Sequence, residues 1–272
     1  MTGLQDFRSK KARKELISMI TAYDYFTAKL VQQVGIDLIL VGDSLGMVFK
    51  GEKHTLGVTL EEIIYHTKAV RRGADDTFII ADLPYMSFHL SVEQTKHNSA
   101  RLIVEGGANA VKLEGGSPGR IEMIKGIVDC EIPVVGHLGL TPQSIYKLGG
   151  YKVQAKLQKE ADLLIKQAKE IEKAGAFMIV LEAIPESVAK VVTSELKIIT
   201  IGIGAGRYTD GQVLVFNDIF GLSDIQPKFA KQYENLADKI VSGLKRYNDD
   251  IKEQRFPRKE HIYYPLTDTE KE

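Results

Sequence analysis

Val41-Gly42-Asp43-Ser44-Leu45-Gly46-Met47 is the stretch that decides the fold of this chain. The residues that lead into it, Asp37-Leu38-Ile39-Leu40-Val41, predict an apolar strand, so the Asp43 carboxylate stands where that strand should end. In parallel α/β proteins, ligands bind at the carboxyl ends of the strands. Asp43 is therefore a candidate for chemistry, although an Asp in a loop can also cap a helix or tighten a turn.

The same order of glycine, apolar strand and acid recurs along the chain, at 35–43, 107–114 and 175–182. Strands alternate with helices roughly eight times over about 250 residues, as a (β/α)₈ barrel (a TIM barrel) requires. The competing fold is a doubly wound open sheet. We favour the barrel because polar residues end many of the strands, whereas an open sheet would gather them at one switch point.

The sequence predicts eight strands. They span 16–21, 38–42, 78–82, 110–114, 132–137, 177–182, 198–202 and, more weakly, 213–216. Thr59-Leu60-Glu61-Glu62 and Ser91-Val92-Glu93-Gln94 are capping boxes that predict two helix starts. The segments 45–58 and 138–157 are glycine-containing loops, long enough to cover a site at the barrel mouth and act as lids.

We expect a single barrel domain over residues 1–272, with its core at about 15–232. A short polar helix at 4–14 precedes the barrel. A C-terminal helical region and tail occupies about 229–272, with the helical pattern itself running from 229 to about 255. Because no composition break or linker interrupts the pattern, a second domain is not predicted.

The composition bounds the class of protein. The chain has 272 residues with 36 basic and 36 acidic side chains, so a zero net charge gives no electrostatic case for nucleic acid or a membrane. Cys130 is the single cysteine, which excludes an internal disulfide and favours a reducing compartment. The sequence has no apolar run of the ~18 residues that a membrane helix needs, and residues 1–14 lack an apolar signal core. A cytoplasmic protein is expected.

The barrel prediction brings a set of charged strand-end residues to one face: Asp43, Asp82, Lys112, Glu114, His137 and Glu182. Lys112 and Glu114 are two residues apart and therefore point the same way from a strand. Such a buried pair is costly unless it is paired or bound to a ligand, and a purely structural ion pair is one alternative. Carboxylates without a Cys or His ligand cluster favour Mg²⁺ over Zn²⁺.

The glycine-rich stretch Gly202-Ile203-Gly204-Ala205-Gly206 follows a predicted strand. It departs from the dinucleotide-binding pattern G-x-G-x-x-G because Arg207 occupies the last position. Dinucleotide binding is thus weakly supported. A tight strand-to-helix turn, or a turn that lets an anion or another ligand approach the backbone, accounts for the glycines equally well.

Taken together, these motifs give the chain a resemblance to the ketopantoate hydroxymethyltransferase family over about residues 15–232. The matching stretches are long and specific: Thr21-Ala22-Tyr23-Asp24-Tyr25, Leu40 to Met47, Tyr65-His66-Thr67, Ala81-Asp82-Leu83-Pro84, Val111 to Gly116, Gly136 to Ser144, Gly149 to Gln154, Ile201 to Gly206 and Asp210-Gly211-Gln212.

The resemblance implies a reaction, a metal and an assembly. Members of this family add a hydroxymethyl group from 5,10-methylenetetrahydrofolate to 3-methyl-2-oxobutanoate to give ketopantoate, in pantothenate biosynthesis. The implied cofactor is one Mg²⁺ per subunit, and the implied assembly is a homo-oligomer, commonly a decamer. The proton leaves C3 of the oxo acid, and the ion stabilises the resulting enolate.

The resemblance also implies residue roles. Asp43, Asp82 and Glu114 would hold the metal, directly or through water. Asp43, Ser44, Asp82 and Lys112 would surround the oxo acid, and Glu182 would be the general base, for which metal ligation is the competing role. Two other functions stay open: a Mg²⁺-dependent 2-oxo acid aldolase or lyase that needs no folate, and a non-catalytic scaffold barrel.

Overall fold

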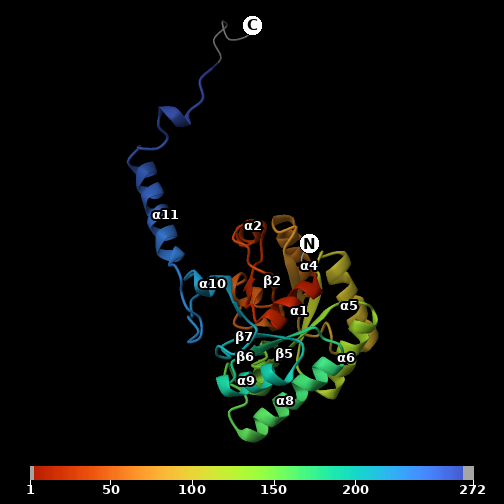
Figure 1. Cartoon of the computed structure of the whole chain (residues 1–272). Helices are drawn as coiled ribbons and strands as arrows, with labels where there is room; N and C mark the ends of the chain where they lie inside the picture. Colours follow the sequence, from red (N-terminus) through yellow and green to blue (C-terminus); the bar gives the residue numbers. More distant parts are fainter. Residues whose placement is uncertain (1–2, 266–272) are drawn as a thin grey trace.

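The computed structural model describes residues 3–265, so the parts of the predictions that fall on 1–2 and 266–272 lie outside it. Eight parallel strands close into a barrel in chain order, and pairing of the last strand with the first seals it (Figure 1). The strands are β1 Ile17–Thr21, β2 Leu38–Val41, β3 Phe78–Asp82, β4 Ala110–Glu114, β5 Val134–Gly139, β6 Met178–Glu182, β7 Ile199–Ile203 and β8 Gly211–Leu214. The (β/α)₈ prediction is confirmed, and the open sheet is wrong.

Helices surround the barrel and cover most of its outer wall (Figure 1). The longer ones are α1 Leu4–Arg13, α2 Tyr25–Gln33, α4 Leu60–Gly73, α5 Val92–Val104, α6 Pro118–Asp129, α8 Gln158–Lys173, α9 Glu186–Glu195 and α11 Leu236–Lys252. The predicted capping box is present at α4, where Thr59 and Glu62 cap each other. At α5 the Ser91 side chain accepts a hydrogen bond from the Gln94 N–H, so both predicted helix starts are confirmed.

Short helical turns lie in the two predicted loops and after the last strand. They are α3 Leu45–Val48 and η1 Thr55–Gly57 in the first predicted loop, η2 Pro142–Ser144 and α7 Ile145–Leu148 in the second, α10 Phe216–Ile219 after β8, and η3 Lys259–His261 near the C-terminus. These turns satisfy backbone groups locally, which lets a long loop stay ordered without joining the barrel.

Three predicted elements have wrong boundaries. The fifth strand was expected at 132–137 but runs over Val134–Gly139, because it pairs with β6 as far as Glu182. The eighth strand was expected at 213–216 but runs over Gly211–Leu214, because it pairs with β1 from Ile17 onwards. A Cβ at Gly211 would lie 2.2 Å from the Ile17 carbonyl oxygen, so only glycine permits this close pairing. The C-terminal helix was expected from residue 229 but begins at Leu236, where Asn235 caps it by accepting the Asp238 N–H.

Side chains alternate along each strand between two cores. One core fills the barrel and includes Ile80 and Val180, whereas the other lies between the barrel and its helices and includes Ile79. Because side chains two residues apart share a face, Asp82 and Glu182 follow Ile80 and Val180 on the inward side. The alternation that builds the core therefore also aims these charged side chains into the barrel mouth.

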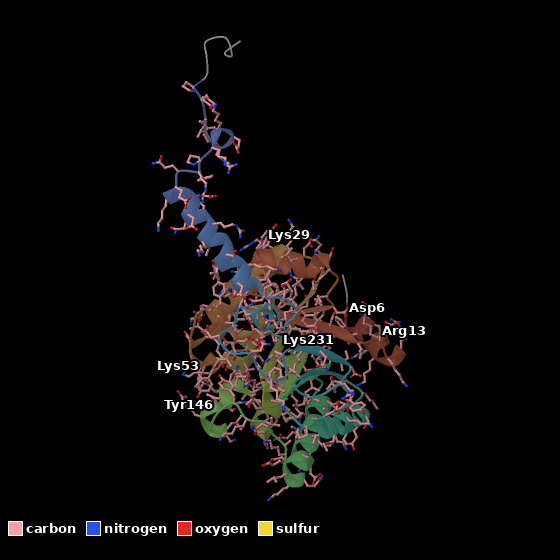
Figure 2. The ribbon with its side chains drawn as sticks, turned by 90° about the vertical axis from the view of Figure 1, so that its left-hand side faces the viewer. Asp6, Arg13, Lys29, Lys53, Tyr146 and Lys231 are labelled. Carbon is pink, nitrogen blue, oxygen red and sulfur yellow. The ribbon has the colours of Figure 1, made fainter. Side chains whose placement is uncertain are left out.

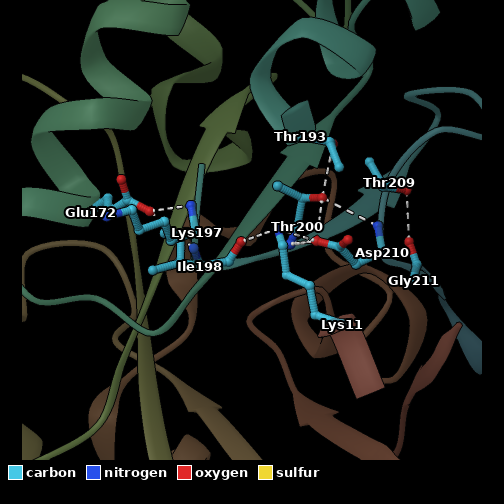
Figure 3. A network of polar contacts seen from close by, with 9 residues as sticks. All are labelled: Lys11, Glu172, Thr193, Lys197, Ile198, Thr200, Thr209, Asp210 and Gly211. Carbon is cyan, nitrogen blue, oxygen red and sulfur yellow. Dashed lines mark hydrogen bonds and ion pairs between the residues drawn. The ribbon is translucent and has the colours of Figure 1, made fainter. Parts of the chain in front are cut away.

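Helix α1 closes the opposite, amino-terminal end of the barrel. Phe7 is fully buried and packs edge-on against Phe78, with ring centroids 5.2 Å apart. The Lys11 ammonium donates to the Asp210 carboxylate at 2.8 Å and to the Ile198 carbonyl at 2.6 Å (Figure 3). The Phe7–Phe78 contact and the hydrogen bonds of Lys11 therefore hold α1 against the amino-terminal end of the barrel, here called the barrel floor.

Helix α11 projects away from the barrel (Figures 1 and 2). Every residue of α11 is at least partly exposed, and its large apolar side chains form one exposed stripe. The members of this α11 stripe are Ile240, Val241, Leu244, Tyr247 and Ile251. An exposed apolar stripe on a helix is typical of a surface that packs against another apolar surface. Left in water, these side chains make no hydrophobic contribution to stability. Over residues 3–265, no helix combines the length and apolarity that crossing a membrane would require.

Candidate active site

The predicted strand-end residues come together at the carboxyl ends of β2 to β6. Asp43 lies just after β2 and is 4% exposed. Asp82 is the last residue of β3 and is 2% exposed. Lys112 and Glu114 on β4 and His137 on β5 are buried to a similar degree. The Glu182 side chain, at the end of β6, is 15% exposed. Buried groups of this kind are rare unless they are paired or bind a ligand.

Lys112 forms an ion pair with Asp82, at 2.7 Å between Nζ and Oδ1. The sheet register sets this pair, because Asp82 lies beside Lys112 on the neighbouring strand. Burial disfavours the lysine charge, but Asp82 and Glu114 outweigh it, so the pKa of Lys112 is raised and the ammonium stays charged. An ion pair is therefore present, but between two strands rather than within β4.

The acids crowd one another. The Asp43 N–H donates to Asp82 Oδ2 at 3.1 Å, which fixes the start of the loop after β2 against β3. Burial, reinforced by the Asp82 charge, raises the pKa of Asp43 to about 7. Burial and the nearby Asp43 raise the pKa of Glu114 well above its usual range. A cation between these carboxylates would relieve both the repulsion and the lost hydration.

Ser44 stands beside the acids and is held from β1. Its hydroxyl lies 2.8 Å from the hydroxyl of Tyr23, a buried residue just after β1 whose pKa burial raises. A Cβ at Gly42 would lie 3.0 Å from Ser44 Oγ and 3.2 Å from Asp82 Oδ2. Gly42 thus leaves room for the serine and the acid to approach each other.

His137 lies between Lys112 and Glu182. Its Nδ1 is 3.4 Å from Lys112 Nζ, and its Nε2 is 3.2 Å from Glu182 Oε2. Burial and the lysine charge push the pKa of His137 well below its usual range, so the ring is neutral. Because an ammonium only donates, Nδ1 must accept, and the hydrogen of the neutral ring resides on Nε2. Over residues 3–265 this hydrogen has no hydrogen-bond partner, although Nε2 lies close to Glu182.

Glu182 has the properties expected of a base that works near neutrality. Burial raises the pKa of its carboxyl to about 7, while Lys112 opposes the rise. A carboxyl group in this range can take up a proton and release it again at neutral pH. The geometry therefore supplies a proton acceptor on one side of the mouth and a cluster of acids with a lysine on the other.

The two predicted loops meet over the mouth. The Tyr151 hydroxyl donates to Met47 Sδ at 3.3 Å, and the Tyr146 hydroxyl lies 3.3 Å from His54 Nε2. Figure 2 has Lys53 and Tyr146 on the same edge of the molecule. The loops are thus in contact in this structure, and their movement as lids stays a prediction.

The carboxylates suit a hard divalent cation. Asp43, Asp82 and Glu114 offer the oxygen ligands that Mg²⁺ prefers. Within the described part of the chain, however, no three Asp, Glu, His or Cys side chains converge closely enough to enclose an ion by themselves. Mg²⁺ usually keeps several water molecules, so these carboxylates would hold it partly through water.

Two residues of the site were not assigned a role from the sequence. Gln143, on η2, donates from Nε2 to Asp43 Oδ2 at 2.8 Å and from its backbone N–H to Glu114 Oε2 at 3.0 Å. Tyr23 holds Ser44. Both lie in the motifs that carry the family resemblance, but neither residue type ends a strand as an acid does. Only their position in those motifs could have marked them.

The fold and the site define an enzyme of the (β/α)₈-barrel class whose charged groups gather at the carboxyl ends of the strands. A family model described as ketopantoate hydroxymethyltransferase matches residues 2–259. The chain belongs to the ketopantoate hydroxymethyltransferase family, which confirms the resemblance and makes the protein a transferase.

Relatives support the assignment over nearly the full length. The chain is 52% identical over 258 residues to the 3-methyl-2-oxobutanoate hydroxymethyltransferase of Clostridium beijerinckii, covering 94% of each chain. It is 51% identical over 261 residues to the protein of the same name from Clostridioides difficile, covering 96% of this chain and 94% of the relative.

Solved structures with low sequence identity share the fold. A phosphoenolpyruvate phosphomutase from Streptomyces platensis has a TM-score of 0.63 at 13% identity, over 97% of this chain and 92% of the other. A phosphonopyruvate hydrolase, solved with oxalate and Mg²⁺, has a TM-score of 0.58 at 15% identity, over 98% and 93%. At these identities the likeness concerns the barrel alone.

Proposed function

We propose that the protein transfers a hydroxymethyl group from 5,10-methylenetetrahydrofolate to 3-methyl-2-oxobutanoate, giving ketopantoate. The family membership and the names of the relatives support the reaction class. The observation that carries the chemistry is the position of Glu182, whose carboxyl has a pKa of about 7 and faces a buried lysine and three acids across the mouth. Removing a proton next to a ketone requires such a base.

Mg²⁺ is the proposed cofactor, one ion per subunit, held by Asp43, Asp82 and Glu114 directly or through water. When bound, the ion supplies Lewis-acid stabilisation of the negative charge that develops on the keto oxygen. The donor set supports this proposal, since Lys112 offsets only part of the negative charge of three buried carboxylates, which otherwise repel one another.

The remaining roles follow from the charges and hydrogen-bond partners. Lys112 offsets the substrate carboxylate, and Ser44, with Asp43 and Asp82, lines the oxo acid. Glu182 accepts the proton from C3. His137 Nε2 lies 3.2 Å from Glu182 Oε2, so the ring packs against the carboxylate that accepts the proton.

The test of the function is a product assay with each component left out in turn. The purified protein should form ketopantoate only when the oxo acid, methylenetetrahydrofolate and Mg²⁺ are all present. Turnover of a 2-oxo acid without folate would instead favour an aldolase or lyase. A protein that turns over none of these mixtures would be a scaffold barrel.

Exchange of the C3 proton with deuterated solvent, followed by NMR without folate, tests the first step separately. Wild-type protein with Mg²⁺ should exchange this proton, because deprotonation precedes attack on the one-carbon unit. If folate is needed for exchange, Glu182 does not act before the cosubstrate binds.

We also propose a cytoplasmic homo-oligomer, which the family resemblance makes a decamer. The α11 stripe is one support. A second is a hollow of about 570 Å³ over the outer wall at β8 and β1, lined by Leu16, Ile17, Gly211 and Gln212 among others. We assign a second copy of the chain as the partner of the α11 stripe. Each chain has both an exposed apolar helix and an uncovered part of the barrel wall, so the helix of one copy can cover the wall of another.

Light scattering tests the assembly. Ten chains of 30.2 kDa predict a mass of about 300 kDa. Leu244→Lys, in the middle of the α11 stripe, should lower that mass. Lys245→Ala, the adjacent change outside the stripe, should leave it unchanged. A wild-type mass of about 30 kDa would contradict the proposal.

A further inference from the structure

Gln143 is a buried residue whose contacts reach three successive strand ends. It is 7% exposed and lies on η2, within the long segment that follows β5. Its Nε2 donates to Asp43 Oδ2 at 2.8 Å, beyond β2, and to the Leu83 carbonyl at 3.0 Å, beyond β3. Its backbone N–H donates to Glu114 Oε2 at 3.0 Å, at the end of β4. One loop residue therefore binds two of the three proposed metal ligands.

These partners decide the orientation of the side-chain amide. The NH₂ group has two hydrogens, and both are directed at acceptors, a carboxylate and a carbonyl. The flipped amide would place Oε1 against those two acceptors, which would repel it. Nε2 is therefore the atom that faces Asp43, and the other amide atom is an oxygen.

Gln143 Oε1 is buried and, over residues 3–265, has no hydrogen-bond partner. A buried acceptor without a partner is unfavourable, so the site is incomplete without a donor. The oxo acid offers oxygens only and cannot supply a hydrogen at neutral pH. A water molecule on a bound Mg²⁺ ion can, since Mg²⁺ in proteins usually keeps several water molecules.

We propose that Gln143 is a positioning residue that couples the 138–157 segment to the metal. Its amide and backbone N–H orient Asp43 and Glu114, and its Oε1 accepts a hydrogen bond from a water molecule bound to the ion. The inference rests on the proposed metal site. Coupling between two sites is reciprocal. If Gln143 strengthens binding of the ion, the ion should stabilise the ordered 138–157 segment by the same free energy.

Metal binding without turnover is the first test. Calorimetry should give a Mg²⁺ dissociation constant about 10- to 100-fold higher for Gln143→Met than for the wild type, the usual loss when a partner of metal ligands is removed. Methionine keeps the length and volume of the side chain and removes both the donors and the acceptor. Gln154→Met is the matched control, because Gln154 lies on the same segment and its side chain binds only the Lys152 carbonyl.

Hydrogen exchange on the wild-type protein is the second test and does not depend on whether the variant folds. Addition of Mg²⁺ alone should slow amide exchange across 141–148. In Gln143→Met, saturating Mg²⁺ should fail to slow that segment. A merely structural glutamine would lower the melting temperature and leave metal affinity and this protection unchanged.

The outcomes separate the two proposals. If the wild type does not bind Mg²⁺ at all, the proposed metal site fails, and the inference fails with it. If the wild type binds Mg²⁺ but Gln143→Met binds it within twofold, or if wild-type exchange over 141–148 does not respond to the ion, the role of Gln143 is refuted and the metal site stands.

Discussion

Glu182→Gln should make the protein more stable at alkaline pH while removing its activity. Burial raises the pKa of the Glu182 carboxyl from 4.5 to about 7. Since one pKa unit is worth about 1.4 kcal/mol, ionising this carboxyl costs the folded state roughly 3 kcal/mol above pH 7. Glutamine has the same shape and no charge to bury, so this cost is absent in the variant.

The sign and the pH range follow from the direction of the shift. The folded-state pKa is higher than the unfolded one, so the folded state is penalised only when the group ionises. The penalty is absent below pH 4.5, grows between pH 4.5 and 7, and is complete above pH 7. Urea denaturation without metal should therefore give up to about 3 kcal/mol more stability for the variant at pH 8, and no such gain at pH 4.5.

The catalytic half of the prediction uses the C3 proton of the oxo acid. The amide cannot accept it, so solvent exchange measured by NMR should slow by roughly two to four orders of magnitude, the usual scale of general base catalysis. Binding of Mg²⁺ and oxo acid should stay near normal. Wild-type exchange should itself fall about tenfold per pH unit below the pKa of Glu182.

Two results would refute this reasoning. Exchange at the wild-type rate in Glu182→Gln would remove Glu182 as the base and make His137 the next candidate. A variant that is less stable than the wild type at pH 8 would mean that the carboxylate is stabilised in the fold rather than penalised by it. Loss of Mg²⁺ binding would support the competing role, metal ligation.

Three further changes test the site and the scaffold. Asp82→Ala should abolish Mg²⁺-dependent binding of the oxo acid in calorimetry while the circular dichroism spectrum stays native; unchanged binding would remove Asp82 from the metal site. Gly139→Ala should destabilise the fold by more than about 2 kcal/mol in urea, because Gly139 has a φ of +97° and a Cβ there would lie 2.1 Å from the Glu182 carbonyl oxygen; an unaffected midpoint would contradict the strain. Lys11→Met should lower thermal stability by about 1–3 kcal/mol through loss of its bonds to Asp210 and Ile198, with kcat at 25 °C unchanged; an altered kcat would mean that the barrel floor influences the mouth.

Much of the fold could be predicted from the sequence because its signals are local. Apolar runs mark strands, and an acid after such a run marks a strand end, which is how Asp43, Asp82 and Glu182 were selected. Alternation along a strand also gave the inward direction of Lys112 and Glu114. These patterns need only neighbouring residues, and the barrel then brings the strand ends together.

Features set by distant residues could not be predicted. Lys112 pairs with Asp82 rather than with Glu114, because the register between β3 and β4 decides which side chains meet. Gln143 binds Asp43 from 100 residues away, and no local pattern indicates that contact. The start of β8 depends on how closely Gly211 can approach β1. The run of apolar residues that predicts the strand gives no information on this distance.

The side chains of the core fill the barrel, and α1 covers its amino-terminal end, so the buried acids are reached from the mouth. With Phe7 packed against Phe78 at the floor, every ligand of the buried acids must enter and leave through the same mouth. A small oxo acid at the depth of Lys112 would then lie beneath a much larger folate. On the proposed function, the small substrate would load first and the spent folate would leave before the product, a last-in, first-out order.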